Sequence, residues 1–375
     1  MNIYNLVLCL LVLLSLTEII ALSSLSSTIA IVKAGRKSSA ITLKQIAVLL
    51  LTTGLAMLSA ARDISVGLDL ANYVPRYIAF GLAEWADLFD LAEYYTFEKG
   101  FAIFCKLLYL VNPNPGFFLA ITSIIIGLGF YQLSRFSKMP ITTVFIVFSF
   151  GFYGASMNIV RQYLAFSILM FGVKFIFERK LFSYLLVIAF AMSFHRMSVL
   201  FVVLYFLYSF PFNTKWFLAV VFAGVFLLLF CEPLIRIAVQ GTYYERYLSR
   251  NVNGSGEKLL ILLFALFCGA CFFQKQILAV DNRQNLYIWG LATALMLNFM
   301  ALKFALVARA MAFFTPLTAV LVPELLYATK RSGVKIYLIF AFAVIGFYVI
   351  YFQIVILGAD AISGGWYPYL LREMS

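Results

Sequence analysis

Residues 141–177 read ITTVFIVFSFGFYGASMNIVRQYLAFSILMFGVKFIF. Two apolar runs, 141–157 and 162–177, each approach the ~20 residues that a membrane-spanning helix needs. The junction between them contains Arg161, followed directly by Gln162. A charged side chain at or near the lipid is costly, so this position predicts a functional site by default.

The composition of the whole chain has the same character. Of its 375 residues, 64% are hydrophobic and 12% are charged, and the mean hydropathy is +0.99. Soluble domains carry about 25% charged residues. Long unbroken apolar runs predict helices, because a membrane barrel would alternate polar and apolar residues. We therefore predict an all-α polytopic membrane protein in which residues 1–375 form a single integral membrane domain.

Hydropathy predicts about twelve transmembrane helices. Their approximate ranges are 3–22, 45–60, 117–134, 141–157, 162–177, 181–194, 197–211, 216–234, 259–274, 285–302, 304–329 and 335–357. A thirteenth apolar segment, 98–112, is interpreted as re-entrant or interfacial, for a reason that the distribution of basic residues supplies.

Lysine and arginine in short loops predict which helix ends face the cytoplasm. The first loop, 33–44, holds four of these cations and is predicted to be cytoplasmic, with the N-terminus outside. If 98–112 does not cross the membrane, the later lysine-rich loops also lie inside. The outer segments favour arginine instead: Arg62, Arg76, Arg161, Arg196, Arg236, Arg246, Arg250, Arg309 and Arg372.

The predicted outer loop, 61–116, carries much of the acidic charge. Seven of the sixteen acidic residues lie between positions 61 and 100. Four of them recur every third residue among aromatic side chains and predict an interfacial amphipathic helix with a solvated acidic face. These four are Glu84, Asp87, Asp90 and Glu93. A second outer loop is predicted at 235–258.

The outer arginines point to an anionic, phosphorylated, lipid-linked substrate. A guanidinium group matches phosphate oxygens with two parallel hydrogen bonds and stays charged at any relevant pH. The alternative is that arginines at helix ends reach the interface or stack on aromatic rings. For Arg161 we favour the phosphate role, because it stands between two apolar runs with Asn158 and Gln162 nearby.

Three groups are candidates for a proton acceptor in such a site. Asp69 follows Gly67, Glu98 opens the 98–112 segment, and His195 is the single histidine of the chain. A carboxylate near arginines can act as a base or orient a sugar hydroxyl, and histidine titrates near neutral pH. His195 precedes Arg196 and could equally hydrogen-bond a neighbouring helix. The sequence leaves the choice among the three open.

Several other kinds of chemistry lack their signatures. A single histidine and scattered cysteines offer no metal-ligand spacing, so no metal site is predicted. No P-loop, Gly-rich dinucleotide turn or Asp-x-Asp pair is present, so no cofactor is predicted. The net charge of +12 is attributed to membrane topology and phosphate binding, and no nucleic-acid partner is expected.

A series of short motifs resembles the EpsG-type, Wzy-like polysaccharide polymerases of bacterial envelopes. The series runs Arg62-x4-Gly67-x-Asp69-x3-Tyr73, Glu98-x-Gly100-Phe101, Asn158-x2-Arg161-Gln162-x2-Ala165 and His195-x2-Ser198, with weaker late motifs at Tyr244-x2-Tyr247 and Arg309-x3-Phe313-Phe314. The resemblance covers roughly residues 45 to 330. The sequence departs from the family pattern at Asp63 and Leu68. These differences concern how the substrate is bound more than which family the sequence resembles.

The resemblance implies a glycosyltransferase of the multi-helix GT-C type that joins undecaprenyl-pyrophosphate-linked oligosaccharide repeat units. The product would be O-antigen, capsule or exopolysaccharide, made at the periplasmic face of the bacterial inner membrane, with a chain-length regulator as a candidate partner. Catalytic roles would belong to Asp69, Glu98, His195 and Arg161. Pyrophosphate and sugar binding would involve Arg62, Tyr73, Asn158, Gln162, Arg196, Tyr244, Arg246 and Arg309.

Two other functions remain alternatives at this stage. One is a ligase that moves a lipid-linked glycan to another acceptor. The other is a flippase or transporter for lipid-linked sugars, which favours charges along helix interiors and inverted repeats. The charges here cluster at one predicted face and no internal repeat is evident, so we prefer chemistry at that face.

Overall fold

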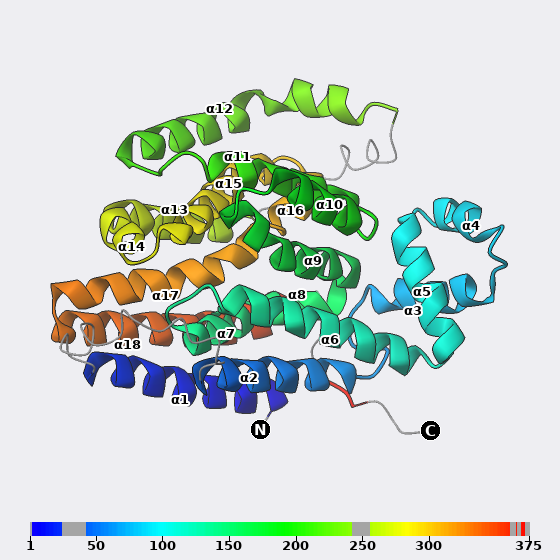
Figure 1. Ribbon diagram of the computed structural model, residues 1–375, viewed down its shortest axis with the longest axis horizontal. Coiled ribbons are helices and arrows are strands. Elements are labelled where there is room, and N and C mark those ends of the chain that lie inside the picture. The colour runs from blue at the N-terminus through cyan, green and yellow to red at the C-terminus, as the bar shows by residue number, and fades with distance from the viewer. Residues whose placement is uncertain (1, 25–42, 242–255, 361–364, 366–368, 372–375) are drawn as a thin grey trace.

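The computed structural model describes residues 2–24, 43–241, 256–360, 365 and 369–371. Helices make up nearly all of this described part, and its β-type pairing is a single isolated bridge between Arg62 and Leu371. Figure 1 shows the helices lying side by side as one long bundle, with a lobe at one end. The prediction of an all-α polytopic membrane protein is confirmed.

Each of the twelve apolar ranges coincides with one helix or with consecutive helices. The first half contains α1 (Ile3–Ser24), α2 (Leu43–Ala60), α6 (Pro115–Ser134), α7 (Pro140–Ser149), α8 (Phe152–Asn158), α9 (Val160–Phe177), α10 (Leu181–Met192), η2 (Arg196–Val202) and α11 (Val203–Leu207). The second half contains α12 (Thr214–Val239), α13 (Glu257–Phe272), α14 (Gln274–Val280), η4 (Asn282–Gln284), α15 (Asn285–Ala301), α16 (Ala305–Met311), η5 (Thr315–Leu317), α17 (Thr318–Thr329), η6 (Lys330–Ser332), α18 (Val334–Tyr351) and the π-helix η7 (Phe352–Asp360).

Six stretches of the described chain are long and apolar enough to cross a membrane: Ile3–Ser23, Leu43–Ala60, Pro115–Ser134, Val160–Phe177, Leu306–Ser332 and Val334–Gly358. Two bent pairs, α7 with α8 at 57° and α13 with α14 at 70°, raise the number to eight if each pair is one span. Three shorter apolar helices add Leu181–Met192, Arg196–Leu207 and Lys215–Phe230. The number of twelve complete crossings stays a prediction.

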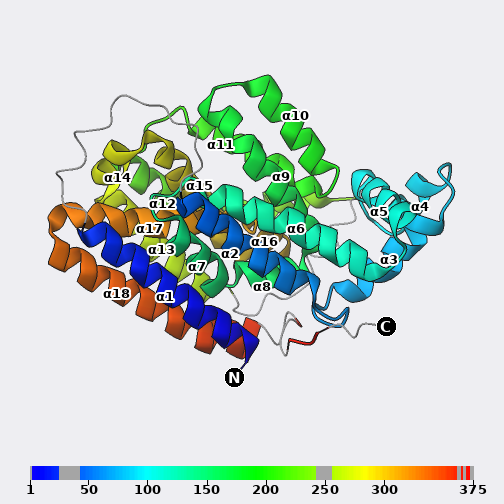
Figure 2. The ribbon, with the colours of Figure 1, turned by 60° about the horizontal axis from the view of Figure 1, so that its bottom comes forward.

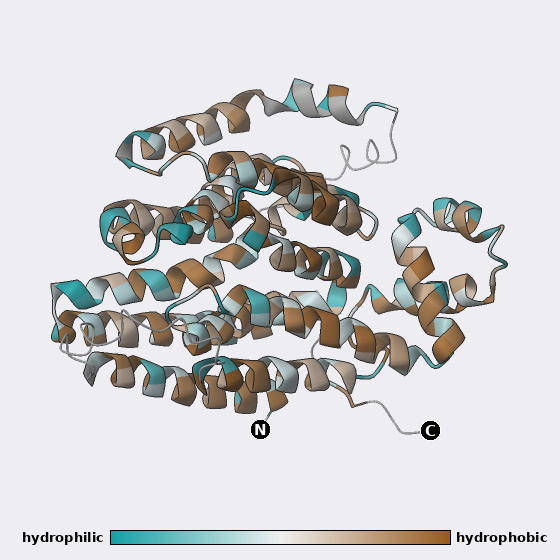
Figure 3. Cartoon of the chain, in the orientation of Figure 1, coloured by the Kyte–Doolittle hydropathy of each residue, from teal (hydrophilic) through white to brown (hydrophobic). Residues whose placement is uncertain are grey.

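The helices differ in how much of their surface the protein itself covers. The stretch containing α17 is 83% buried within the bundle, whereas the windows of α1, α2 and α18 are each 28% buried. The outer helices expose large apolar side chains such as Leu13 and Leu50. Such a surface suits lipid rather than water. Figure 3 shows this pattern, with hydrophobic residues along the helices and hydrophilic residues mostly at their ends and in the lobe.

The predicted outer loop forms a helical lobe, of which the first helix was not predicted, whereas the two later helices match the predicted amphipathic helix and the apolar segment 98–112. The lobe consists of α3 (Leu70–Leu82), α4 (Leu88–Tyr94) and α5 (Lys99–Val111), and Figures 1 and 2 both place it beyond the same end of the bundle. The 13 residues of α5 would extend only ~20 Å. This length fits the prediction that 98–112 does not cross. The four acidic residues around α4 are exposed, as the sequence predicted.

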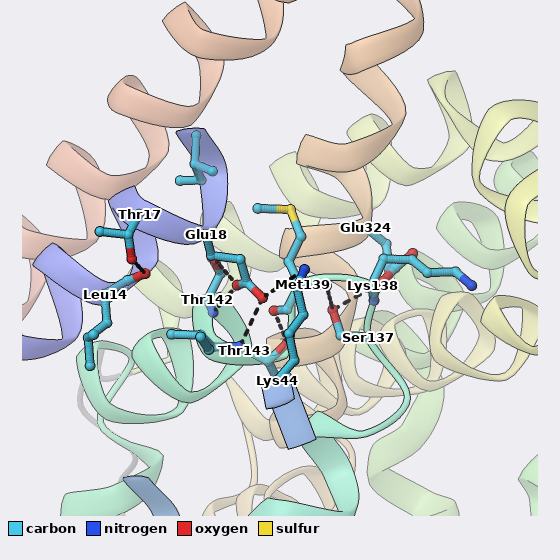
Figure 4. Close-up of polar contacts among 12 residues, drawn as sticks. Leu14, Thr17, Glu18, Lys44, Ser137, Lys138, Met139, Thr142, Thr143 and Glu324 are labelled. Carbon is cyan, nitrogen blue, oxygen red and sulfur yellow. Dashed lines mark hydrogen bonds and ion pairs between the residues drawn. The ribbon is translucent and has the colours of Figure 1, made fainter. Parts of the chain in front are cut away.

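At the opposite end of the bundle, the predicted cytoplasmic loops meet one another. Figure 4 shows the buried Glu18 carboxylate, which accepts a hydrogen bond from the Thr142 N–H at 2.8 Å and pairs with Lys44 at 3.8 Å. The buried Glu324 carboxylate accepts from the Ser137 hydroxyl at 3.1 Å. Both carboxylates lie at the start of α7, where the helix dipole favours negative charge. We call this the lysine-rich end, since it gathers loops that contain Lys44, Lys138, Lys180, Lys275 and Lys330.

The gathering of these loops at one end leads to a prediction about topology. Reporter fusions after residues 40, 138, 180 and 332 should report the cytoplasm, and fusions near 85 and 250 should report the outer side. The physical reason is that cytoplasmic loops retain an excess of lysine and arginine during insertion. Paired alkaline phosphatase and green fluorescent protein fusions would measure this, because each reporter works on one side only. A cytoplasmic signal at residue 85 would contradict both the orientation and the outer location of the lobe.

Candidate active site

The first turn of α9 and the lobe meet through Arg161. Its guanidinium forms an ion pair with the Glu98 carboxylate, and both side chains are largely buried. The same guanidinium lies 4.0 Å above the centre of the Phe97 ring and within 6 Å of the Tyr73 and Phe101 rings. A cation held against aromatic faces and one carboxylate has a fixed orientation. Arg161 is therefore a positioned cation and not a freely moving side chain at a helix end.

Glu98 connects three elements of the chain. It is the residue before α5, its Oε2 pairs with Arg161, and its Oε1 accepts a hydrogen bond from the Arg196 backbone N–H at 3.2 Å. The close approach of α5 to the end of α10 depends on Gly100, because a Cβ there would lie 2.2 Å from the Ser193 Oγ. Glu98 thus fixes the relative positions of α5, α9 and η2.

Asp69 stands directly before α3, on the short segment that enters the lobe. Its backbone N–H donates to the Asn158 Oδ1 at 2.8 Å, which ties it to the end of α8. The segment comes this close because Gly67 adopts a φ of +112°, where a Cβ would meet the Met157 carbonyl oxygen at 2.8 Å. The Asp69 carboxylate does not cap α3, and no ion pair is formed by it within the described ranges.

The electrostatic environment of Asp69 favours proton uptake. Burial raises the pKa of its carboxyl above the ordinary value of 3.8, and the positive charges of Arg309 and Arg161 partly offset that rise. A carboxylate with a raised pKa is a better proton acceptor at neutral pH than a fully solvated one. Asp69 is thus a half-buried base candidate within the field of two arginines.

His195 lies in the same polar region but in a different state. Its ring contacts the Phe313 ring at a centroid distance of 5.4 Å, and its Nδ1 is buried with no hydrogen-bond partner in the described chain. Burial, together with the charges of Arg161 and Arg309, lowers the pKa of His195 to about 3. The imidazole is therefore neutral at physiological pH and a weak proton acceptor.

Arg309 reaches the site from α16, far along the sequence. Gln162 on α9 donates from Nε2 to the Arg309 carbonyl oxygen at 2.8 Å, so the two helices are joined beside Arg161. The Arg309 side chain is exposed, and its charge acts on both Asp69 and His195. Gln162 itself is 4% exposed and positions α16. Arg196 is also exposed, next to His195.

The structure places Arg62 differently from the other predicted arginines. Its side chain is 1% exposed, and its guanidinium donates to the Met157 carbonyl oxygen at 3.2 Å and to Ser59 on α2. This buried position does not favour the predicted pyrophosphate contact. Arg62 instead supports the backbone just before Asn158, and its role as a ligand stays an untested prediction.

The other predicted residues divide into two groups. Tyr73 and Asn158 lie at the site, Tyr73 as part of the aromatic surround of Arg161 and Asn158 as the acceptor for Asp69. Tyr244 and Arg246 lie outside the described residues. Sequence reasoning missed Phe97, the ring closest to Arg161, although its position directly before Glu98 was a usable signal.

No group of three or more histidine, cysteine, aspartate or glutamate side chains gathers in the described part of the chain in a way that could hold a metal ion. The polar groups that do converge come from positions 69, 98, 158, 161, 195 and 309. They offer two arginines, two carboxylates, one amide and one neutral imidazole. Such a set can bind an anionic leaving group and deprotonate a hydroxyl.

The comparison with known families bears directly on this arrangement. Residues 45–371 match the EpsG family. The matched range includes every element of the site and most of the chain. The chain belongs to the EpsG family. The EpsG family is a family of glycosyltransferase-like polysaccharide polymerases, so the Wzy-like resemblance seen in the motifs is confirmed. Neither a curated protein nor a solved structure gives a significant match to the chain.

Proposed function

We propose that this EpsG-family protein polymerises oligosaccharide repeat units carried on undecaprenyl pyrophosphate, at the outer face of the cytoplasmic membrane. The observation that supports this most is the convergence of Asp69, Arg161 and Arg309 where the lobe meets the first turn of α9. A base beside two cations suits a reaction that activates a hydroxyl and releases a pyrophosphate.

The reaction can be written with its bonds balanced. The bond between the anomeric carbon of the growing chain and its pyrophosphate oxygen breaks, and a bond forms between that carbon and a hydroxyl oxygen of the next lipid-linked unit. The hydroxyl proton passes to the Asp69 carboxylate, and the electron pair leaves with undecaprenyl pyrophosphate. The energy comes from the pyrophosphate linkage, so no nucleotide or metal enters the reaction as written.

The cations stabilise the charge that develops on the leaving group. Arg161 is held by Glu98 and by the Phe97 ring, so it is oriented before substrate arrives. Preorganised donors of this kind stabilise a transition state without reorganisation during the reaction. Arg309 and Arg196 are more exposed and can adapt to the pyrophosphate and the first sugar.

The three base candidates can now be ranked. Glu98 is bound to Arg161 and to the Arg196 backbone, so its role is to orient the cation. His195 is neutral and weakly basic, which suits it to accept a hydrogen bond from a sugar hydroxyl. Asp69 has a raised pKa and no cap or ion-pair partner in the described ranges, so we assign the base to it.

The test uses the purified full-length protein in lipid vesicles. The lipid-linked substrate lies in the vesicle membrane, with its repeat units facing the outside. We expect a ladder of polymers and release of undecaprenyl pyrophosphate in proportion to the bonds formed. In cells, deletion should leave single repeat units on the carrier at the outer face and abolish long polymer. If the unit failed to reach the outer face in the deletion strain, the transporter alternative would replace this proposal.

A further inference from the structure

The C-terminal segment, described at residue 365 and residues 369–371, packs on the chain section that carries Asp69. The Asp63 N–H donates to the Leu370 carbonyl oxygen at 2.9 Å, and the Gly67 N–H donates to the Gly365 carbonyl oxygen at 2.7 Å. Arg62 and Leu371 form the isolated antiparallel bridge. Residues about 300 positions apart in the sequence are thus joined by backbone hydrogen bonds.

Side chains add to this attachment. The Tyr369 hydroxyl donates to the Leu58 carbonyl oxygen at 2.5 Å, and its ring meets the Tyr4 ring edge-on at 5.7 Å. Gly365 has a φ of +67°, and a Cβ at this position would lie 2.7 Å from the Leu68 Cγ and 3.0 Å from the Leu68 nitrogen. The backbone of the C-terminal segment therefore lies directly on the residue before Asp69.

The same section is also held by α8. Gly67 contacts the Met157 carbonyl oxygen, the Arg62 guanidinium donates to that oxygen, and Asn158 binds the Asp69 N–H. The section 62–69 is thus contacted both by α8 and by the C-terminal segment. If the contacts with either α8 or the C-terminal segment were lost, the section that carries Asp69 would be held by the other contacts alone.

We propose that the C-terminal segment is a positioning element for Asp69, holding its carboxylate at the reacting hydroxyl. The inference rests on the proposed function, because it takes Asp69 as the base. It adds that residues 365 and 369–371 contribute to catalysis without contacting the substrate. A displacement of ~1 Å in a reacting group can cost up to about 100-fold in rate.

The first experiment replaces Gly365 with Ala in the full-length protein. The added methyl group must displace Leu68 or the C-terminal segment, so we expect kcat to fall ~10- to 100-fold while KM for the lipid-linked unit is unchanged. Gly241→Ala is the matched control, because Gly241 has a φ of +70° and no atom of the described residues lies within 4 Å of its would-be Cβ. It introduces similar backbone strain and should leave kcat unchanged.

The pH profile separates positioning from mere stabilisation. Burial raises the pKa of the Asp69 carboxyl, and the charges of Arg309 and Arg161 act against that rise. If the C-terminal segment shifts, the Asp69 carboxyl becomes more exposed to solvent and its pKa falls. The acidic limb of the pH profile, where activity is lost, then moves to lower pH. A chain ended after Asp360 should show the same shift, with a greater loss of kcat and normal insertion in the membrane.

The outcomes distinguish this inference from the proposed function. It is supported if Gly365→Ala lowers kcat and moves the acidic limb while Gly241→Ala does neither. It is overturned if Gly365→Ala and the shortened chain keep the wild-type kcat per folded molecule and the wild-type pH profile. If Asp69→Asn retains full activity, the proposed function loses its base and the inference is overturned with it.

Discussion

Asp69→Asn should reduce polymer formation by ~10²- to 10⁴-fold, the range typical of losing a general base. The amide keeps the shape of the side chain, and the Asp69 N–H can still donate to Asn158, so the fold of the segment should persist. The measurement is the rate of undecaprenyl pyrophosphate release by purified protein, normalised to folded protein. Wild-type activity should rise with pH through a value above 3.8, because the raised pKa of Asp69 must be passed before the carboxylate can accept a proton.

Two matched substitutions serve as controls for this result. His195→Gln should cause a smaller loss and leave the acidic limb in place, since the pKa of His195 near 3 already makes it neutral. Glu98→Gln should hold Arg161 less firmly and lower activity. The fall of activity at acidic pH should remain. If His195→Gln instead abolished activity and Asp69→Asn did not, the assignment of the base to Asp69 would be wrong.

The fold was largely predictable because lipid imposes a simple rule on sequence. Backbone groups in lipid must bond within their own helix, so long apolar runs such as 117–134 and 335–357 translate directly into α6 and α18. The first helix of the lobe was not predictable in the same way. Helix α3 carries Arg76 and Pro75 and is amphipathic, and its stability depends on packing against α5, which hydropathy does not report.

The candidate site was predictable as a list of residues but not as an arrangement. Asp69 was identified by its place after Gly67 in the outer loop, and Arg161 and Arg309 were identified as arginines of the predicted outer segments. The same argument selected Arg62, which the fold buries against Ser59 and Met157. Charge and neighbourhood in sequence do not specify which cation faces the site. That depends on contacts between helices, such as the hydrogen bond from Gln162 to the Arg309 carbonyl.

The choice of base needed information that only packing provides. Sequence alone gave Asp69, Glu98 and His195 equal standing. The ion pair with Arg161 accounts for Glu98, and burial among cations accounts for the low pKa of His195. Partners and burial are set by residues far away in the sequence, as Arg309 is from Asp69, and no local pattern records them.

Arg161→Lys should lower polymerisation by ~10²- to 10³-fold at a normal protein level, the loss expected when one preorganised donor to a developing oxyanion is removed. Lysine keeps the positive charge and can still pair with Glu98. It loses the two-pronged guanidinium and the planar contact with the Phe97 ring at 4.0 Å. The measurement is kcat and KM with lipid-linked repeat units, and the loss should lie mainly in kcat, because the charge develops in the transition state.

Arg76→Lys provides the matched control for this substitution. The Arg76 guanidinium lies 4.1 Å above the Tyr95 ring in the lobe, so the change removes a comparable stacking contact outside the set of side chains assigned to the site. We expect near-wild-type kcat for Arg76→Lys, which would show that the loss at Arg161 does not come from weakened stacking alone. If Arg161→Lys polymerises at the wild-type rate, Arg161 anchors a helix end, and the leaving-group role would have to belong to Arg309 or Arg196.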